Sequence, residues 1–240
     1  MRDFGFGKKG SETIVLDECE SMKIAIIEMM KKNDGIINVD KLFNKAALNV
    51  VWSVTADERY DYDDKNMEKL YHFLDLFTLM GRHIIGKPLG IFPILKHFPP
   101  FRQIYNKASN GMAECRAFIK ETIERHEKTL DPNNPRDFID KFLVDMEKES
   151  STAFTKEHLL FCCLDLFLGG SETTSKSLMF ALVMLIRNPE IQEKVFEEIS
   201  EATNDNEVVT MADREKLPFT EATLNEVWRS CNVIPILPPR

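Results

Sequence analysis

The chain has 240 residues, with 39 acidic against 31 basic side chains and a formal net charge of −8. This length provides enough material for one or two domains with a substantial core. The acidic balance argues against the basic footprint that nucleic-acid binding requires, so we expect no nucleic-acid partner. The sequence begins MRDFG, and we expect neither a signal peptide nor an N-terminal anchor in it.

Cysteine and histidine usage bears on disulfide and metal sites. The five cysteines are odd in number and lack CxxC spacing, which favours reduced intracellular thiols over a disulfide framework or a zinc site. The five histidines are scattered without an HExxH pair, so we expect most of them at or near the surface. The cysteines are Cys19, Cys115, Cys162, Cys163 and Cys231.

Apolar residues recur every three or four positions through most of the chain, which predicts amphipathic helices. The expected helices in the first two thirds cover 11–32, 39–55, 65–83, 101–128 and 137–148. The acidic, aromatic stretch 57–64 is predicted to be a loop. Because no segment alternates convincingly with a period of two, the predicted fold class is mainly α, with few or no strands. We expect a single domain over residues 1–240.

Residues 88–100, PLGIFPILKHFPP, form an unusual connector. Four prolines exclude a regular helix, although most of the other residues are apolar. Loops normally lie on the surface, and an exposed apolar loop marks an interaction site. Membrane contact, a lid over a ligand entrance and simple packing over the core are the three interpretations that the pattern leaves open.

Thr155 to Arg187 predict a central helix about 50 Å long. Thr155 is placed to cap its start, and Phe154 and Leu159 are spaced as a hydrophobic staple. Both halves are apolar on nearly every side, as in a buried or membrane-spanning helix. Between them lies the polar stretch GGSETTSKS, residues 169–177, and a charged Lys at mid-bilayer costs about 2.5–3.5 kcal/mol. We therefore expect the buried axis of a soluble domain.

The adjacent Gly169 and Gly170 require a reason of their own. Each glycine inside a helix costs about 1 kcal/mol relative to alanine, so something near them needs a bare backbone. A flat ligand pressing on the helix would meet that need, and so would the close crossing of another helix. The pattern alone leaves both explanations open.

Two more helices are expected after the central one, beginning at Pro189 and Pro218, where proline suits the first helical position. The last helix carries Glu226 and Arg229, which lie three residues apart and so share a face. Such a pair is commonly a surface ion pair. The neighbouring Trp228 favours a partly buried helix instead.

Two of these patterns together resemble a known family. Residues 169–174, GGSETT, in a long apolar helix resemble the oxygen-activation signature of the cytochrome P-450 haem-thiolate monooxygenases, which reads small-Gly-x-acid-Thr-Thr. Residues 217–222, LPFTEA, running into Glu226-x-x-Arg229 and Ile234-Pro235, resemble the Glu-x-x-Arg helix and exit strand of that family. The shorter segments RDFGFG (2–7), DLF (165–167) and RNPE (187–190) are similar to microsomal animal members. The resemblance extends over essentially the whole chain.

The resemblance implies the helical portion of the cytochrome P-450 fold and haem as the cofactor of the full-length protein. The central helix would run over the distal face of haem, with Gly169, Gly170 and Thr173 next to the cofactor. The two glycines would leave room for dioxygen and substrate, while Thr173 and Glu172 would deliver protons during oxygen activation. General acid catalysis of this kind contributes about 10²–10⁴-fold.

Other roles follow from the same resemblance. Glu226 and Arg229 would form a structural ion pair within a buried ionic network. The reaction would insert one atom of dioxygen into an apolar small molecule, with an NADPH-dependent P-450 reductase as electron donor. The parent protein would reside on the endoplasmic reticulum membrane, with 88–100 as a lid near the membrane surface. The substrate pocket would include Leu166, Phe167, Val233, Ile234 and Leu237.

The family's axial cysteine ligand lies in a Phe-x-x-Gly-x-Arg-x-Cys-x-Gly loop, and no cysteine here fits that pattern. Cys115 follows Gly111 by four and Cys231 follows Arg229 by two, without the other diagnostic residues. We therefore expect no metal ligand in this chain, and an internal fragment without the N-terminal anchor or the haem-cysteine loop, inactive by itself. A helical module that binds an apolar ligand without catalysis, and an inactive remnant, are the competing interpretations.

Overall fold

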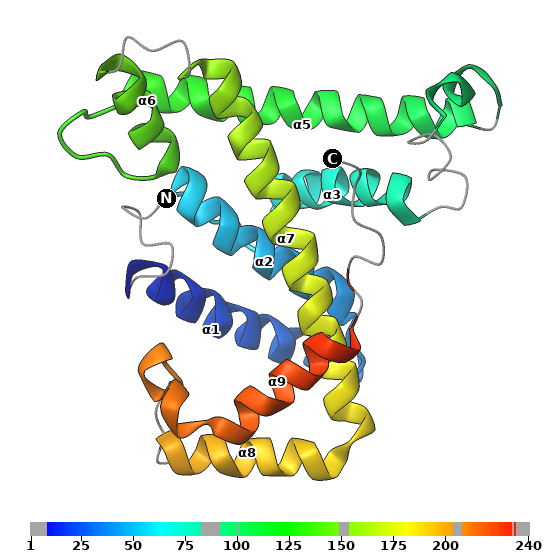
Figure 1. The fold of residues 1–240 in the computed structure, drawn as a ribbon, viewed down its shortest axis with the longest axis vertical. Helices are drawn as coiled ribbons and strands as arrows, with labels where there is room; N and C mark the ends of the chain where they lie inside the picture. Colours follow the sequence, from blue (N-terminus) through cyan, green and yellow to red (C-terminus); the bar gives the residue numbers. More distant parts are fainter. Residues whose placement is uncertain are drawn as a thin grey trace. The chain divides into compact units, whose positions relative to one another are not determined.

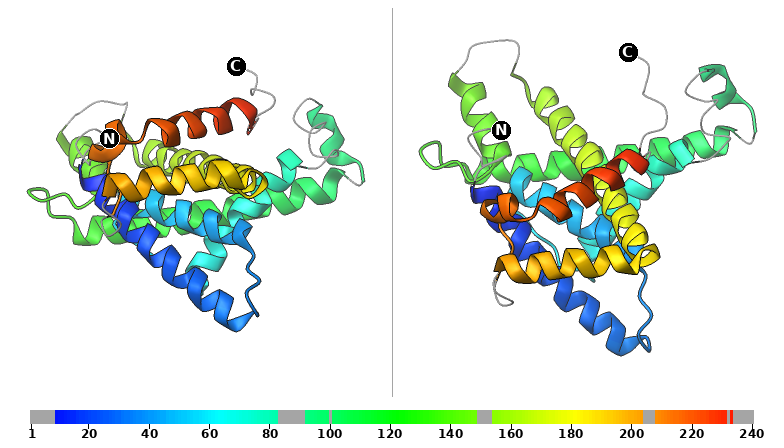
Figure 2. Two further views of the ribbon diagram at one scale, coloured as in Figure 1. Left: turned by 90° about the horizontal axis from the view of Figure 1, so that it is seen from below. Right: turned by 60° about the horizontal axis from the view of Figure 1, so that its bottom comes forward.

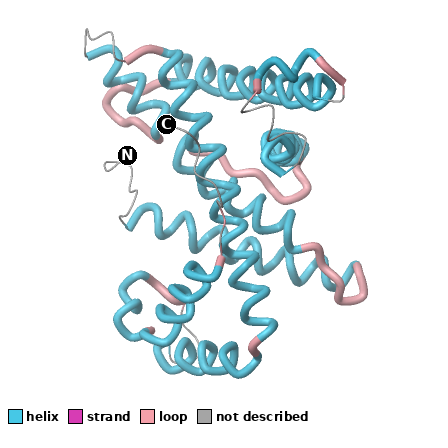
Figure 3. The backbone as a smooth tube through the Cα atoms, turned by 45° about the vertical axis from the view of Figure 1, so that its right-hand side comes forward, coloured by secondary structure: helices cyan, strands magenta, loops and turns pink. Residues whose placement is uncertain are grey.

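The computed structural model describes residues 9–82, 92–99, 101–148, 154–203, 208–231 and 233. Within these ranges all regular structure is helical and no strand occurs (Figure 3). This confirms the mainly α fold class. In chain order the elements are α1 (Lys9–Lys32), α2 (Val39–Ala56), α3 (Lys65–Arg82), the 3₁₀ helix η2 (Pro93–His97), α5 (Phe101–Thr129), α6 (Phe138–Lys148), α7 (Lys156–Arg187), α8 (Pro189–Thr203), the 3₁₀ helix η3 (Met211–Lys216) and α9 (Pro218–Ser230) (Figure 1).

The expected helix boundaries agree closely with the observed ones. The central helix was expected over 155–187 and runs over Lys156–Arg187, with the Thr155 hydroxyl accepting a hydrogen bond from the backbone N–H of His158 at 3.2 Å. The first helix begins two residues before the expected cap, Ser11. Neither 3₁₀ helix was anticipated. None of the described helices combines the length and the apolar character needed to cross a bilayer.

The chain divides into two compact units, one formed by residues 51–170 and the other by residues 1–50 and 171–240. Helices α2 and α7 each contribute residues to both. The expectation of a single domain over residues 1–240 stays a prediction.

The unit of residues 51–170 is organised around α5. Helix α3 lies alongside α5, and α6 packs against it (Figure 1). Trp52 is fully buried, with its ring 5.6 Å from Phe118 and 6.2 Å from Phe167. Four apolar residues of α5, spaced as on one face of a helix, are buried: Ala108, Cys115, Ile119 and Ile123.

The second unit, residues 1–50 and 171–240, is held by polar as well as apolar contacts. The amide of Asn49 on α2 donates a hydrogen bond to the buried Glu18 carboxylate of α1 at 3.1 Å. The Glu12 carboxylate of α1 accepts a hydrogen bond from the backbone N–H of Met211, at the start of η3. Helices α8 and α9 lie side by side, joined through η3 (Figure 2). Helix α9, which carries Glu226 and Arg229, is therefore placed mainly by α8 and η3.

Candidate functional site

The GGSETT segment lies in the middle of α7, which stays helical through both glycines. Gly170 is required by packing, because a Cβ at this position would lie 2.8 Å from Cγ2 of Val51 on α2. Gly169 is different, since a Cβ there would meet no atom within 4 Å. The close helix crossing thus accounts for Gly170, whereas the space beside Gly169 stays available for a ligand.

Glu172 and Thr173, the expected proton-delivery pair, are both half-buried. The Glu172 carboxylate forms an ion pair with the Lys176 ammonium one helical turn later. The Ser177 hydroxyl donates a hydrogen bond to the Thr173 carbonyl at 2.9 Å. The polar side chains of residues 169–177 thus interact with one another and with the helix backbone in the middle of α7.

Serine residues attach this part of α7 to its unit. Ser171 and Ser175 are buried, and the Ser175 hydroxyl lies 2.8 Å from the Asn44 side-chain oxygen on α2. Ser175 also contacts the Glu172 carbonyl at 3.0 Å. A hydroxyl has one hydrogen, so it donates to one of these two oxygens at a time. The Ser175–Asn44 hydrogen bond joins α7 to α2 one turn after Glu172.

Glu226 and Arg229 form the expected ion pair on α9. The Arg229 guanidinium donates from Nε to Oε2 of Glu226 at 2.7 Å and from Nη2 to Oε1 at 2.6 Å. These hydrogen bonds hold the pKa of Glu226 below its ordinary value. The side chains are 73% and 61% exposed for Arg229 and Glu226, so within the described residues the pair lies on the surface. Val227 beside it is buried, but Trp228 is exposed.

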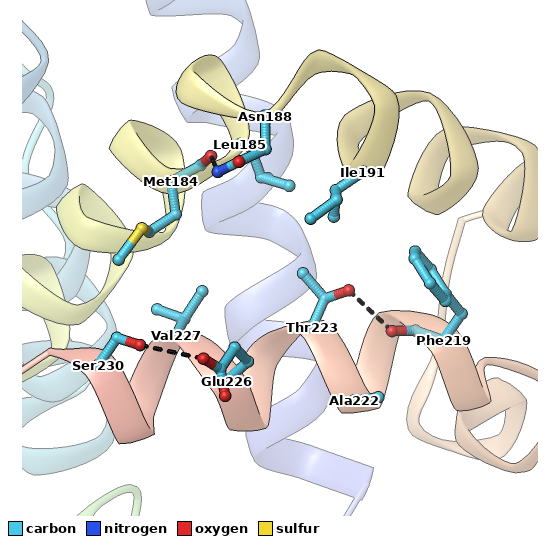
Figure 4. Close-up of a pocket in the computed structure, with 10 residues that line it drawn as sticks. All are labelled: Met184, Leu185, Asn188, Ile191, Phe219, Ala222, Thr223, Glu226, Val227 and Ser230. Carbon is cyan, nitrogen blue, oxygen red and sulfur yellow. Dashed lines mark hydrogen bonds between the residues drawn. The ribbon is translucent and has the colours of Figure 1, made fainter.

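An apolar groove of about 420 Å³ lies between the end of α7, the start of α8 and one face of α9 (Figure 4). Glu226 lies at one rim of the groove, and Asn188 contributes an amide that donates to the Met184 carbonyl at 2.8 Å. No local sequence pattern predicts this groove, because its walls come from three separate helices. Its apolar lining includes Met184, Leu185, Ile191, Phe219, Ala222 and Val227.

The expected substrate-pocket residues occupy different environments. Phe167 is fully buried in edge-to-face contact with Trp52, so it belongs to the packed core of its unit. Leu166 and Val233 are half-buried. Ile234 and Leu237 lie outside the described residues, as do residues 2–7, 88–91 and 100. Their expected roles therefore stay predictions.

A buried charged cluster at the junction of α5 and α6 was not anticipated, because the histidines were expected at or near the surface. Nδ1 of His126 lies 2.9 Å from the Thr122 carbonyl and Nε2 lies 2.7 Å from Oδ2 of Asp137. Both partners accept hydrogen bonds, so they favour the protonated ring, which has a hydrogen on each nitrogen. Burial acts to lower the pKa of His126, but the bonds to Asp137 and the Thr122 carbonyl raise it above its ordinary value.

The same cluster contains Asp140, which lies close enough to His126 and Asp137 for the three to resemble a metal-binding set. The Arg136 guanidinium, however, donates to both carboxylate oxygens of Asp140, at 2.6 and 2.9 Å. Arg136 thus pairs with Asp140, and His126 with Asp137. We interpret this cluster as a structural ion-pair network that secures α6 to α5.

Burial affects the thiol pKa of four of the five cysteines. Burial raises the pKa of both Cys115 and Cys163 to about 12. Burial, aided by a neighbouring carboxylate, also raises the pKa of Cys19 and of Cys162. A nucleophilic cysteine is normally a thiolate with a lowered pKa. These four thiols are therefore not activated as nucleophiles.

Comparison with known proteins gives the context of these features. The family model described as Cytochrome P450 matches residues 1–240. The chain is 35% identical to Cytochrome P450 2B15 of Rattus norvegicus over 247 residues, covering 100% of this chain and 48% of that protein. It is 36% identical to Cytochrome P450 2J5 of Mus musculus, and the match covers 98% of this chain and 46% of that protein. It is 34% identical to Cytochrome P450 2B4 of Oryctolagus cuniculus, and the match covers 98% of this chain and 48% of that protein.

The chain thus spans about half the length of the curated relatives it matches. The match covers α7 with its GGSETT segment and α9 with its Glu-x-x-Arg pair, the two patterns on which the resemblance was based. Family membership implies haem as the cofactor of the full-length protein. The chain belongs to the cytochrome P450 family.

Proposed function

We propose that the full-length protein containing these residues is a haem-dependent monooxygenase that inserts one atom of dioxygen into an apolar small molecule. The observation that carries this proposal is the family match over residues 1–240, with the GGSETT segment placed in the middle of an unbroken α7. Electrons would come from an NADPH-dependent P-450 reductase. The parent protein would act at the endoplasmic reticulum membrane.

We propose that α7 forms one side of the haem site. The open space next to Gly169 is compatible with a flat cofactor and a small ligand beside the helix. None of the five cysteines lies in the family's axial-ligand pattern. We propose that the thiolate is supplied by sequence outside these 240 residues, and that residues 1–240 alone have no monooxygenase activity.

Haem would supply oxygen activation, and the residues of α7 would serve it by moving protons and shaping the space. Thr173 offers a hydroxyl and Glu172 a carboxylate on adjacent positions, so together they can pass a proton toward the reacting centre. Gly169 would leave room for the substrate, and Leu166 and Val233 would line its pocket, as would Ile234 and Leu237. Phe167 would support the pocket from the core, because its ring is packed against Trp52.

Spectroscopy and product analysis of the full-length protein test this function. The protein is expressed with haem, reduced and exposed to carbon monoxide, and then supplied with reductase, NADPH and isotopically labelled dioxygen. We expect the absorption band of thiolate-ligated haem and one labelled oxygen atom in the product of an apolar substrate. A correctly folded protein that shows the band but incorporates no label from any apolar substrate would contradict the monooxygenase assignment.

The connector around η2 supports membrane contact by the region 88–100. Phe92, Ile94 and Phe98 are exposed, with fractions of 59%, 68% and 57%. Lys96 and Arg102 border a polar hollow next to these side chains. Exposed apolar side chains with cations near them in the sequence suit the interface of a bilayer. Vesicle flotation of residues 1–240 tests the contact: replacing all three apolar residues by serine should abolish flotation, and unchanged flotation would refute it.

A second candidate is supported by the groove between α7, α8 and α9, whose size and apolar lining suit a small hydrophobic molecule. Under this alternative the protein binds an apolar ligand without catalysis. Thermal-shift measurements with haem and with apolar ligands in parallel separate the two functions. Stabilisation by apolar ligands in protein that takes up no haem favours the binding module, whereas stabilisation that requires haem favours the monooxygenase.

A further inference from the structure

The first turn of α9 lacks a local cap. The first N–H groups of any helix have no partner within the helix, and a Ser, Thr, Asp or Asn side chain commonly binds them. Here the capping position is occupied by Leu217, which forms no side-chain hydrogen bond to the helix. Pro218 follows and has no N–H to donate. The N–H groups of Phe219 and Thr220 therefore require an acceptor from another part of the chain.

That acceptor is Glu198, on the neighbouring helix α8. Its Oε1 accepts a hydrogen bond from the backbone N–H of Phe219 at 2.8 Å. Its Oε2 accepts one from the backbone N–H of Thr220 at 2.7 Å and another from the Thr220 hydroxyl at 2.6 Å. Both carboxylate oxygens thus serve a helix that starts some twenty residues later in the sequence, and all three donors belong to two consecutive residues.

The charge of Glu198 suits this position. Partial burial acts to raise the pKa of Glu198, but the hydrogen bonds from Thr220 and from the two backbone N–H groups bring it below its ordinary value. A carboxylate is also favoured at a helix N-terminus, where the helix dipole is positive. One helical turn earlier on α8, the Lys194 ammonium lies 5.9 Å from the centre of the Phe219 ring and adds a second contact to the same turn.

We propose that Glu198 is a positioning residue for the Glu-x-x-Arg helix. By capping α9 from α8, it fixes where α9 begins and therefore the height at which Glu226 and Arg229 project relative to α8. These two residues follow the capped turn by two helical turns on a continuous helix, so a shift at the start of α9 is carried to them. Glu198 acts through the α9 backbone and does not touch the ion pair itself.

Variants of the full-length protein test the cap directly. Glu198→Ala removes both acceptor oxygens, and Glu198→Gln keeps one neutral acceptor. Glu197→Ala is the matched control, because it removes the same charge from the adjacent, exposed position of α8. We expect amide exchange at Phe219 and Thr220 to accelerate at least tenfold in Glu198→Ala relative to Glu197→Ala, and less in Glu198→Gln. Equal exchange in Glu198→Ala and Glu197→Ala would overturn the proposal.

A titration of the wild-type protein separates capping from general support of the fold. With ¹⁵N-phenylalanine labelling, the Phe219 amide signal should titrate with a midpoint below the ordinary glutamate pKa of 4.5, and this titration should vanish in Glu198→Gln. A Phe219 signal that titrates identically in both proteins would refute the cap. The titration is recorded on the wild-type protein and on Glu198→Gln, and it does not require bound haem. If no haem binds while the titration follows Glu198, the proposed function fails and the cap stands.

Discussion

The Lys176 ammonium lies next to the Glu172 carboxylate, one turn further along α7, and the two form an ion pair inside the segment that carries the oxygen-activation pattern. The Glu172 side chain is 13% exposed and that of Lys176 is 32% exposed, so the pair is largely shielded from solvent. A residue outside the GGSETT pattern is thus paired with the acidic residue within it.

Replacing Lys176 by methionine should destabilise the protein. The apolar side chain fills the same space but leaves the shielded Glu172 carboxylate without its cation, which costs about 1–3 kcal/mol. Glu172→Gln added to Lys176→Met should recover most of that loss, because no unpaired charge is then left. Free energies of unfolding in urea for the two single variants and the double variant provide the measurement. Additive effects of the two changes would show that the pair has no energetic role.

The proposed proton-delivery residues should affect turnover without affecting substrate binding. Thr173→Val and Glu172→Gln each remove one proton carrier, so we expect the turnover number of the full-length enzyme to fall about 10²-fold or more. Substrate affinity should change little, since neither group is proposed to bind substrate. Thr174→Val is the control, because Thr174 is the exposed neighbour in the same segment. Equal losses for Thr173→Val and Thr174→Val would remove Thr173 from the proposed mechanism.

The two glycines of α7 should respond to alanine in opposite ways. Gly170→Ala forces a Cβ against Val51, and overpacking of this kind costs about 1–3 kcal/mol. Gly169→Ala meets open space and improves helix propensity, so stability should be unchanged or rise by up to about 1 kcal/mol. Thermal unfolding of both variants, with Val51→Ala added to Gly170→Ala as the rescue, checks this. A loss in Gly169→Ala equal to that in Gly170→Ala would contradict the assignment.

The buried His126 network predicts a specific dependence of stability on pH. The pKa of His126 is raised in the folded protein, relative to about 6.5 when unfolded. Its ionic contribution is therefore fully present below about pH 6.5 and is lost as the pH rises through the folded pKa. His126→Gln removes one partner of a buried pair, which should cost about 3–5 kcal/mol where the pair is charged.

Unfolding free energies of wild type and His126→Gln between about pH 5 and 9 measure this effect. The difference between the two proteins should be largest at the acidic end and shrink as the pH rises. His158→Gln provides the control, because His158 is exposed near the start of α7. A difference that grows with rising pH would show that His126 is neutral in the folded protein.

The helix boundaries could be predicted from the sequence because the residues that mark the start of a helix lie within one turn of it. Thr155 as a cap and Pro189 and Pro218 as first helical residues each mark a boundary within one turn of where it occurs. The apolar stripe of α5 follows from helical periodicity alone. The 3₁₀ helix η2 was missed because four prolines exclude a regular α-helix but permit a single tight turn.

Features that depend on tertiary contacts were out of reach of the sequence. No local sequence pattern indicates that Glu198 caps a helix about twenty residues later, or that His126 forms a hydrogen bond with Asp137 after the intervening turn. The packing reason for Gly170 needed Val51, more than one hundred residues away. For the two glycines the sequence left a ligand and a helix crossing as alternatives. The structure assigns the crossing to Gly170 and leaves the open space to Gly169.

We propose that the α7 segment and the α9 ion pair belong to one haem-thiolate enzyme whose axial ligand lies outside these 240 residues. The decisive measurement is the reduced, carbon monoxide-treated spectrum of the full-length protein, recorded beside that of residues 1–240 supplied with haem. We expect the thiolate-haem band for the full-length protein and none for residues 1–240. The band in residues 1–240, or its absence from folded full-length protein containing haem, would refute the proposal.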